Sequence, residues 1–176
     1  MLYNIDRPYF LALKTFIKYS NYKKAIMFMA CTFFTYLLSE HQKVFFKAQL
    51  DSEPTTAIAG NQVIRFGRIQ HNQGNSYNRE TGKFTAPVSG MYQFTFHLCP
   101  NLNNDAFYGL VHNGIFLVTG EIFNSAQEVC FSHTEIVPVQ TGDTVWVQNR
   151  HATLAFALYE NDWHDNTFSG FLLQKL

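Results

Sequence analysis

The sequence of 176 residues lacks an excess of either charge and lacks any short-period repeat. Thirteen basic and thirteen acidic side chains cancel, and the sequence pI is near 7.0. Because proteins that bind nucleic acids carry a basic excess that neutralises phosphates, this balance argues against DNA or RNA as a partner. The absence of a Gly-x-y period and of sustained heptads excludes a collagen stalk or a coiled coil in this chain.

Motifs of catalysis are also missing. The chain contains no Gly-x-Ser-x-Gly elbow, no His-Glu-x-x-His zinc helix and no glycine loop of the kind that binds phosphates. His133-Thr134-Glu135 is similar to the start of a zinc deaminase motif, but no Pro-Cys-x-x-Cys follows it. His97 and Cys99 fall on the same side of a strand-like run, where a structural histidine is the simpler interpretation. We therefore expect no enzymatic activity and no required cofactor.

Basic residues are concentrated before residue 25, and a short apolar run follows them. The first 24 residues carry five basic side chains (Arg7, Lys14, Lys18, Lys23 and Lys24) against Asp6, which leaves 8 basic and 12 acidic side chains in the rest. Residues 25–38 are apolar, and Ser39 follows them. This order is typical of a secretory signal peptide. As a helix the run spans roughly 21 Å, less than the ~30 Å hydrocarbon core, so we expect cleavage near Ser39 and secretion.

Two alternatives to a cleaved signal peptide stay open. The long basic segment also fits an uncut signal anchor, which would give a type II membrane protein held through residues 25–38. Translation could also begin at Met27 or Met29. The expected organisation is thus a basic leader with a signal peptide or signal anchor in residues 1–39, a short linker in 40–43 and one globular domain in 44–176. Membrane contact is expected only if the leader stays uncut.

The remainder of the chain reads as β-strands separated by turns. In residues 91–98 apolar side chains alternate with polar ones, as a half-buried strand requires. Residues 154–159 alternate large and small apolar side chains, which predicts another strand in a tightly packed sandwich. Asn113-Gly114 lies between two apolar runs and is a strong hairpin signal. The pattern predicts an all-β sandwich or jelly roll.

Cysteine is scarce, with three residues in the chain. Cys31 lies in the apolar run and would leave with a cleaved signal peptide. Cys99 and Cys130 remain, and an oxidising compartment would allow them to form a disulfide. Both lie in strand-like stretches, so two buried, unpaired thiols are the alternative.

A set of spaced aromatic residues, with one asparagine and one glycine, runs through the middle of the chain. Its members are Phe66, Asn72, Tyr77, Phe84, Gly90, Tyr92, Phe94 and Phe96. This spacing resembles the signature of the C1q domain family, the globular heads of the C1q and tumour-necrosis-factor superfamily. Residues 45–50 and 168–173 resemble the first and last strands of that family. Independently of the resemblance, the alternate rings from Tyr92 to Phe96 would share a buried face, and Asn72 would cap a turn.

The resemblance implies a ten-stranded jelly-roll β-sandwich that assembles as a homotrimer. Members of the family are secreted recognition modules whose loops bind carbohydrates, microbial surfaces, other proteins or Ca²⁺. Because the chain has no collagen stalk, it is similar to members that consist of the globular head. It is therefore expected to be a lectin-like recognition protein of innate immunity. The alternatives are an extracellular ligand for a protein receptor and an acidic, calcium-binding matrix protein.

Two polar clusters are candidates for ligand binding. The first is the loop 160–166, with Glu160, Asp162, Trp163, His164 and Asp165 as candidate ligand-binding residues. Its carboxylates could hold Ca²⁺ and its indole could stack on a sugar. Asp162 and Asp165 are the candidate calcium ligands. The second contains Asn101, Asn103, Asn104 and Asp105, whose amides and carboxylate suit sugar hydroxyls. The competing interpretation of the first cluster is a solvated loop whose Trp163 packs back on the barrel.

Overall fold

The computed structural model describes residues 22–24, 27, 43–51, 57–102, 104–123 and 129–176. The chain divides into two compact units, Met1–Gln42 and Lys43–Leu176. Apart from Met27, the predicted signal segment 25–38 lies outside the described residues, and so do Ser39 and Asn103. Within the described part of the chain, no helix combines the length and hydrophobicity needed to cross a bilayer.

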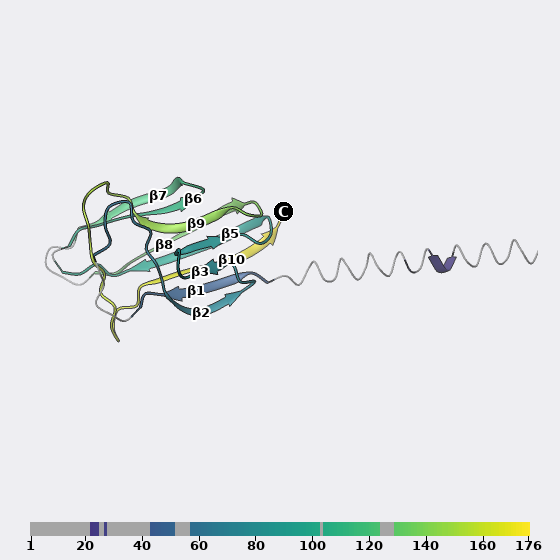
Figure 1. Cartoon of the computed structure of the whole chain (residues 1–176), viewed down its shortest axis with the longest axis horizontal. Coiled ribbons are helices and arrows are strands. Elements are labelled where there is room, and N and C mark those ends of the chain that lie inside the picture. Colours follow the sequence, from purple (N-terminus) through teal and green to yellow (C-terminus); the bar gives the residue numbers. More distant parts are fainter. Residues whose placement is uncertain (1–21, 25–26, 28–42, 52–56, 103, 124–128) are drawn as a thin grey trace, which may run out of the picture. The chain divides into compact units, whose positions relative to one another are not determined.

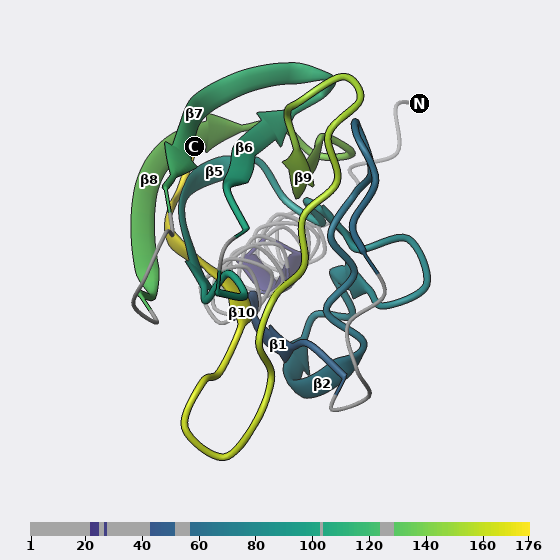
Figure 2. The ribbon, with the colours of Figure 1, turned by 90° about the vertical axis from the view of Figure 1, so that its left-hand side faces the viewer.

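The second unit is built from ten strands, which form two antiparallel sheets (Figures 1 and 2). The strands are β1 (Phe45–Gln49), β2 (Arg68–Gln73), β3 (Tyr77–Asn78), β4 (Lys83–Thr85), β5 (Gly90–Leu98), β6 (Ala106–His112), β7 (Ile115–Ile122), β8 (Phe131–Val139), β9 (Thr144–Asn149) and β10 (Thr167–Lys175). Sheet 1 has the order β2-β1-β10-β5-β8 and sheet 2 the order β3-β4-β9-β6-β7. The expected all-β jelly-roll sandwich is confirmed.

The core between the sheets is dominated by aromatic rings. Along β5 every second residue is buried, and Tyr92, Phe94 and Phe96 are fully inaccessible to solvent. Phe94 packs edge-to-face on Phe84 with ring centroids 5.1 Å apart, and Phe46 of β1 stacks on Phe84 at 5.4 Å. Edge-to-face and stacked rings gain favourable quadrupole interactions beyond the burial of their area. The rings therefore hold the two sheets together.

Hydrogen bonds of Asn72 and Tyr77 connect the turn after β2 to the rest of the sandwich. The Asn72 side chain accepts hydrogen bonds from the backbone N–H groups of Ser76 and Tyr77, both 3.0 Å long, and donates to the Tyr77 carbonyl at 2.8 Å. The Tyr77 hydroxyl bonds the backbone of Phe66. Burial raises the pKa of Tyr77 to about 12, so the hydroxyl keeps its proton.

Gly90 begins β5 at a place where two strands approach each other closely. A Cβ atom there would lie 2.5 Å from the Gln174 carbonyl oxygen and 2.4 Å from Leu172 Cδ1 of β10. The backbone carbonyl has little freedom to move away, so a side chain at this position would push β5 and β10 apart.

Two local predictions have different outcomes. Asn113 and Gly114 have φ of 49° and 86° and join β6 to β7, which confirms the predicted hairpin. The strand predicted at residues 154–159 is wrong, because this segment makes only isolated bridges at Phe156 and Leu158. These two side chains are buried, but Leu154 is half exposed. The two bridged residues pair with different segments, at Ile58 and Pro100, so no continuous ladder forms.

The ends of the second unit and the candidate loops lie at opposite ends of the sandwich (Figure 1). Leu172 N–H donates to the Val44 carbonyl and Leu176 N–H to the Ser89 carbonyl, which places the start of β1 beside the end of β10. The yellow-green segment that precedes β10 projects from the other end, at the lower left of Figure 1. The loop that precedes β10 is therefore remote from residue 43, where the second unit begins.

Candidate functional site

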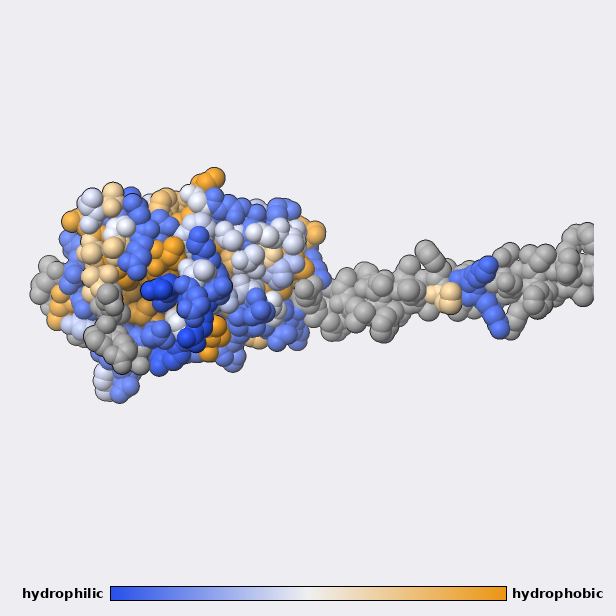
Figure 3. Space-filling model, in the orientation of Figure 1, coloured by the Kyte–Doolittle hydropathy of each residue, from blue (hydrophilic) through white to orange (hydrophobic). Residues whose placement is uncertain are grey.

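The loop from Tyr159 to Asn166 projects beyond the end of the sheets and presents Trp163. Asn161 Oδ1 accepts hydrogen bonds from the backbone N–H groups of Trp163 and His164, at 2.9 and 3.0 Å. The Asn161 and His164 backbones also bond each other, which closes a tight turn. Trp163 lies in this turn with 89% of its surface exposed, so the competing interpretation, in which this ring packs back on the domain, is wrong. In Figure 3 the projecting loop carries mainly hydrophilic residues.

Glu160 anchors this loop to sheet 1. Its side chain is buried, with 2% of its surface exposed. One carboxylate oxygen accepts from Gln49 Nε2 at 2.6 Å and lies 3.3 Å from Arg68 Nη2, and the other accepts from Asn166 N–H at 2.8 Å. Charge-assisted hydrogen bonds to a buried carboxylate are short and directional, so they fix the groups that make them. Glu160, predicted as a ligand-binding residue, therefore lies where it positions the loop.

A polar depression lies beside the loop. It has a volume of about 510 Å³ and is lined by Gln49, Arg68, Gln70, Glu160, Asn161, Asp162 and Asp165. Gln49 Nε2 also donates to Asp165 Oδ1, and Gln70 Nε2 donates to Gln49 Oε1. Three carboxylates against one guanidinium make the depression acidic. Its hydrogen-bonding groups suit a hydroxyl-rich or cationic ligand better than an anionic one.

Three lining residues came from outside the predicted cluster: Gln49 on β1, and Arg68 and Gln70 on β2. They are separated from Glu160 by about half of the chain, and the Gln49–Glu160 hydrogen bond spans 111 positions. The one feature of the sequence that could have indicated these residues is Gln49, a polar residue near the end of the run that resembles a first strand. It is buried, with 4% of its surface exposed.

The second predicted cluster begins next to the first. Asn101 N–H donates to the Ala157 carbonyl at 3.0 Å, and Pro100 bridges Leu158. Asn104 N–H donates to the Asn101 carbonyl at 3.1 Å, which folds the segment into a local turn. Asp105 is exposed, and Asn103 lies outside the described residues. The structure thus brings the bases of the two loops together at one end of the sandwich.

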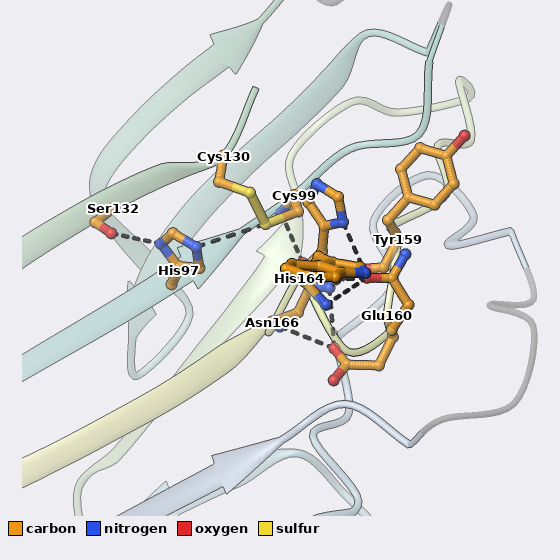
Figure 4. Close-up of a disulfide and its surroundings, with 10 residues drawn as sticks. His97, Cys99, Cys130, Ser132, Tyr159, Glu160, His164 and Asn166 are labelled. Carbon is orange, nitrogen blue, oxygen red and sulfur yellow. Dashed lines mark hydrogen bonds between the residues drawn. A yellow bond between two sulfur atoms is a disulfide. The ribbon is translucent and has the colours of Figure 1, made fainter. Parts of the chain in front are cut away.

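Cys99 and Cys130 form a disulfide between the end of β5 and the start of β8, with Cα atoms 4.1 Å apart (Figure 4). His97 lies beside it, with Nε2 3.5 Å from Cys99 Sγ and Nδ1 2.6 Å from Ser132 Oγ. Burial lowers the pKa of His97 from its usual value, and the negative charge of Asp165 opposes this shift. Cys99 N–H donates to Asn166 Oδ1 at 2.6 Å, so the disulfide is also joined to the candidate loop.

Two antiparallel five-stranded sheets packed face to face define a β-jelly-roll domain with polar loops at one end. A family model described as "C1q domain" matches residues 44–173, and the chain belongs to that family. Over 110 residues it is 34% identical to "Complement C1q tumor necrosis factor-related protein 2" of Mus musculus and of Homo sapiens. These matches cover 62% of this chain and 37% and 38% of the two relatives, so the chain aligns with less than half of their length.

Solved structures show the same fold. The "Globular Domain of Zebrafish Complement 1qA protein" superposes with a TM-score of 0.64 at 21% identity, covering 76% of this chain and 99% of that one. The "Structure of Eiger TNF from S. frugiperda" gives a TM-score of 0.60 at 12% identity, covering 77% and 94%. At these identities the likeness concerns the architecture, which both a complement head and a tumour-necrosis-factor protein share.

Proposed function

We propose that this chain is a secreted, homotrimeric C1q-domain protein that binds carbohydrate or microbial surface molecules in innate immunity, and that it is not an enzyme. The observation that carries the proposal is Trp163, which is 89% exposed on a loop beside a polar depression. An indole stacks on the apolar face of a sugar ring, while carboxylates and amides accept or donate bonds to its hydroxyls.

The loop is held in place before a ligand arrives. Glu160 and Asn166 fasten its two ends, and Asn161 closes the turn that carries Trp163. A loop that is already ordered loses less conformational entropy on binding. Asp162 is exposed and Asp165 lines the depression, so these carboxylates would contact the ligand while Glu160 supports them.

Replacing Trp163 by alanine should weaken glycan or microbial binding by roughly tenfold per site, because one stacking contact is lost. The free energy of unfolding should change by less than about 0.5 kcal/mol, since the ring is exposed. A glycan array and a microbial pull-down, each with the chain made in secreting cells, measure the binding. Ile115→Ala, which removes another strongly exposed side chain, is the control. Unchanged binding by Trp163→Ala would contradict the assignment of the loop.

Calcium binding by Asp162 and Asp165 stays part of the proposal. Carboxylate oxygens are preferred ligands of Ca²⁺, which takes 6–8 oxygens in all. Both oxygens of Glu160 already accept hydrogen bonds, so these two aspartates would need water or a ligand to complete the shell. Repeating the array with a calcium chelator, for the native chain and for Asp162→Asn/Asp165→Asn, separates calcium-dependent binding from direct binding.

The outer face of sheet 1 supports the proposed trimer. The register places Phe45, Phe171, Gln93 and Ile136 in one row across β1, β10, β5 and β8. The three hydrophobic side chains are 38%, 41% and 54% exposed. An apolar row on an outer sheet face is typical of a surface that another subunit covers. We propose that three copies pack through this face, which would also bring three ligand sites together and raise the avidity.

Ile136→Glu should convert the trimer into monomers, because three buried carboxylates would repel each other and lose their hydration. Sedimentation equilibrium or light scattering of the purified protein measures the mass. Ile115→Glu, at an exposed position on β7 in the other sheet, should leave the trimer intact. A native protein that is monomeric at micromolar concentration would refute the trimer directly.

One observation favours a second function, that of a ligand for a protein receptor. Ile115, Phe116 and Leu117 begin β7, an edge strand of sheet 2, and all three are exposed. Exposed apolar residues on an edge are common anchors of protein partners. Capture of a cell-surface receptor together with a blank glycan array would favour this function over carbohydrate recognition.

A further inference from the structure

Three potential metal ligands lie together at the end of β5. The atoms His97 Nε2, Cys99 Sγ and Cys130 Sγ are all within 4.8 Å of one another (Figure 4). All three come from the same chain, and the strand pairing of β5 with β8 brings them together. In the structure the two sulfurs are bonded to each other. The oxidation state of this pair therefore decides whether the sulfurs can bind anything else.

The spacing suits zinc once the sulfurs are free. On a tetrahedral Zn²⁺, bond lengths of ~2.3 Å to sulfur and ~2.05 Å to nitrogen put sulfur and nitrogen about 3.6 Å apart and two sulfurs about 3.8 Å apart. Nε2 of His97 already lies 3.5 Å from Cys99 Sγ. The sulfurs are 2.06 Å apart as a disulfide, so they need to separate by less than about 2 Å, which side-chain rotation supplies.

The hydrogen bonds around His97 and Cys99 are of the kind that orient the ligands of a bound metal. His97 Nδ1 lies 2.6 Å from Ser132 Oγ, so a proton on Nδ1 leaves the Nε2 lone pair directed at the sulfurs. Metal-binding histidines are normally oriented by such a hydrogen bond from the other ring nitrogen. Asn166 fixes the backbone of Cys99 through its N–H group. These contacts hold two of the three ligands in place independently of the disulfide.

We propose that the Cys99–Cys130 disulfide gates a zinc site. The oxidised chain binds no zinc there, and the reduced chain binds one Zn²⁺ through two thiolates and His97 Nε2, with water in the fourth position. The inference does not rest on the proposed recognition function, since it concerns residues of β5 and β8 and not the ligand loop.

Formation of the zinc site requires a dithiol reductant that reduces the Cys99–Cys130 disulfide. One thiolate of the reductant attacks Cys130 Sγ, because Cys99 is buried and Cys130 is not. A mixed disulfide forms and Cys99 leaves as a thiolate. The second reductant thiolate then closes the reductant's own disulfide and releases Cys130, so two electrons pass to the protein. Zn²⁺ binds the two thiolates, and any proton still held on sulfur is released to water.

The test uses the full chain with Cys31→Ser, which removes the third thiol. The protein is reduced by an immobilised dithiol, separated from it without oxygen and titrated with Co²⁺ and then Zn²⁺. We expect thiolate-to-cobalt absorption and tetrahedral cobalt bands at one metal per chain, displaced by Zn²⁺. The oxidised chain should show neither the thiolate-to-cobalt absorption nor the tetrahedral cobalt bands. Zn²⁺ should also raise the Tm of the reduced chain and leave that of the oxidised chain unchanged.

Matched variants separate this site from adventitious binding to thiols. His97→Ala should weaken zinc binding at least about tenfold, and Ser132→Ala by roughly 10–100-fold through loss of ring orientation. His71→Ala, at an exposed position on β2, should bind as the parent does. If reduction unfolds the metal-free chain, Zn²⁺ should refold it. The proposal is overturned if cobalt absorption is absent, if His97→Ala leaves it unchanged, or if Zn²⁺ fails to restore a reduced, unfolded chain.

Discussion

Replacing Phe94 by alanine should lower the free energy of unfolding of the globular unit by about 3–5 kcal/mol. The ring is fully buried, and its centroid lies 5.1 Å from that of Phe84 and 6.1 Å from that of Phe168. Deleting it removes contacts to rings from both sheets and leaves a cavity that neighbouring strands cannot close. A loss of this size approaches the total stability of many domains, so we also expect poor secretion.

Urea unfolding monitored by circular dichroism measures this loss. Phe123→Ala is the matched control, because it removes the same ring at a position that is 70% exposed. The control should cost less than about 1 kcal/mol. Equal losses in the two variants would contradict the placement of the aromatic signature inside the sandwich.

Removing the disulfide should have an effect of similar size. Cys99 and Cys130 are 31 positions apart, and closing a loop of that length restricts the unfolded chain by an entropy worth about 4 kcal/mol. In metal-free buffer, Cys99→Ser/Cys130→Ser should therefore lower the Tm by roughly 10–20 °C. The closed loop contains all of β6 and β7, so the loss affects the pairing of sheet 2 as well as the β5–β8 contact.

Differential scanning calorimetry with and without a dithiol reductant checks this prediction. The reductant should destabilise the native chain about as much as the double substitution does, and it should have no effect on the double variant. Cys31→Ser should leave both curves unchanged, since Cys31 belongs to the other unit. Equal Tm values for the native and double-variant chains would show that the cross-link contributes nothing.

Much of the fold was predictable from the sequence, because it depends on interactions between residues that are neighbours in the chain. The alternation from Tyr92 to Leu98 is a property of neighbouring residues, and the strand β5 follows from it. Asn113 and Gly114 tolerate positive φ, so the hairpin they form is also encoded locally. Residues 154–159 show the limit of such reasoning. Their alternation is real, but Phe156 and Leu158 are buried against different distant segments, which no local pattern indicates.

The candidate loop was recognisable from composition, and its surroundings were not. Trp163 and its acidic neighbours form a polar insertion between apolar runs, which a sequence displays directly. The burial of Glu160 depends instead on contacts with Gln49 of β1 and Arg68 of β2. The Arg68–Glu160 contact joins residues 92 positions apart. Which carboxylate is buried and supports the loop, and which ones stay exposed, is therefore a consequence of strand packing.

From its residues alone this protein is an all-β domain with aromatic interior faces, turn positions and C1q-type spacing, because strand period and turn chemistry act over a few residues. The tertiary structure decided whether Cys99 and Cys130 are joined, and it decided which groups surround them. Pairing of Leu98 with Phe131 sets the register of β5 against β8, and the next residues outward are the two cysteines. Register depends on hydrogen bonds between strands far apart in the chain, so it exists only once the sheets have formed.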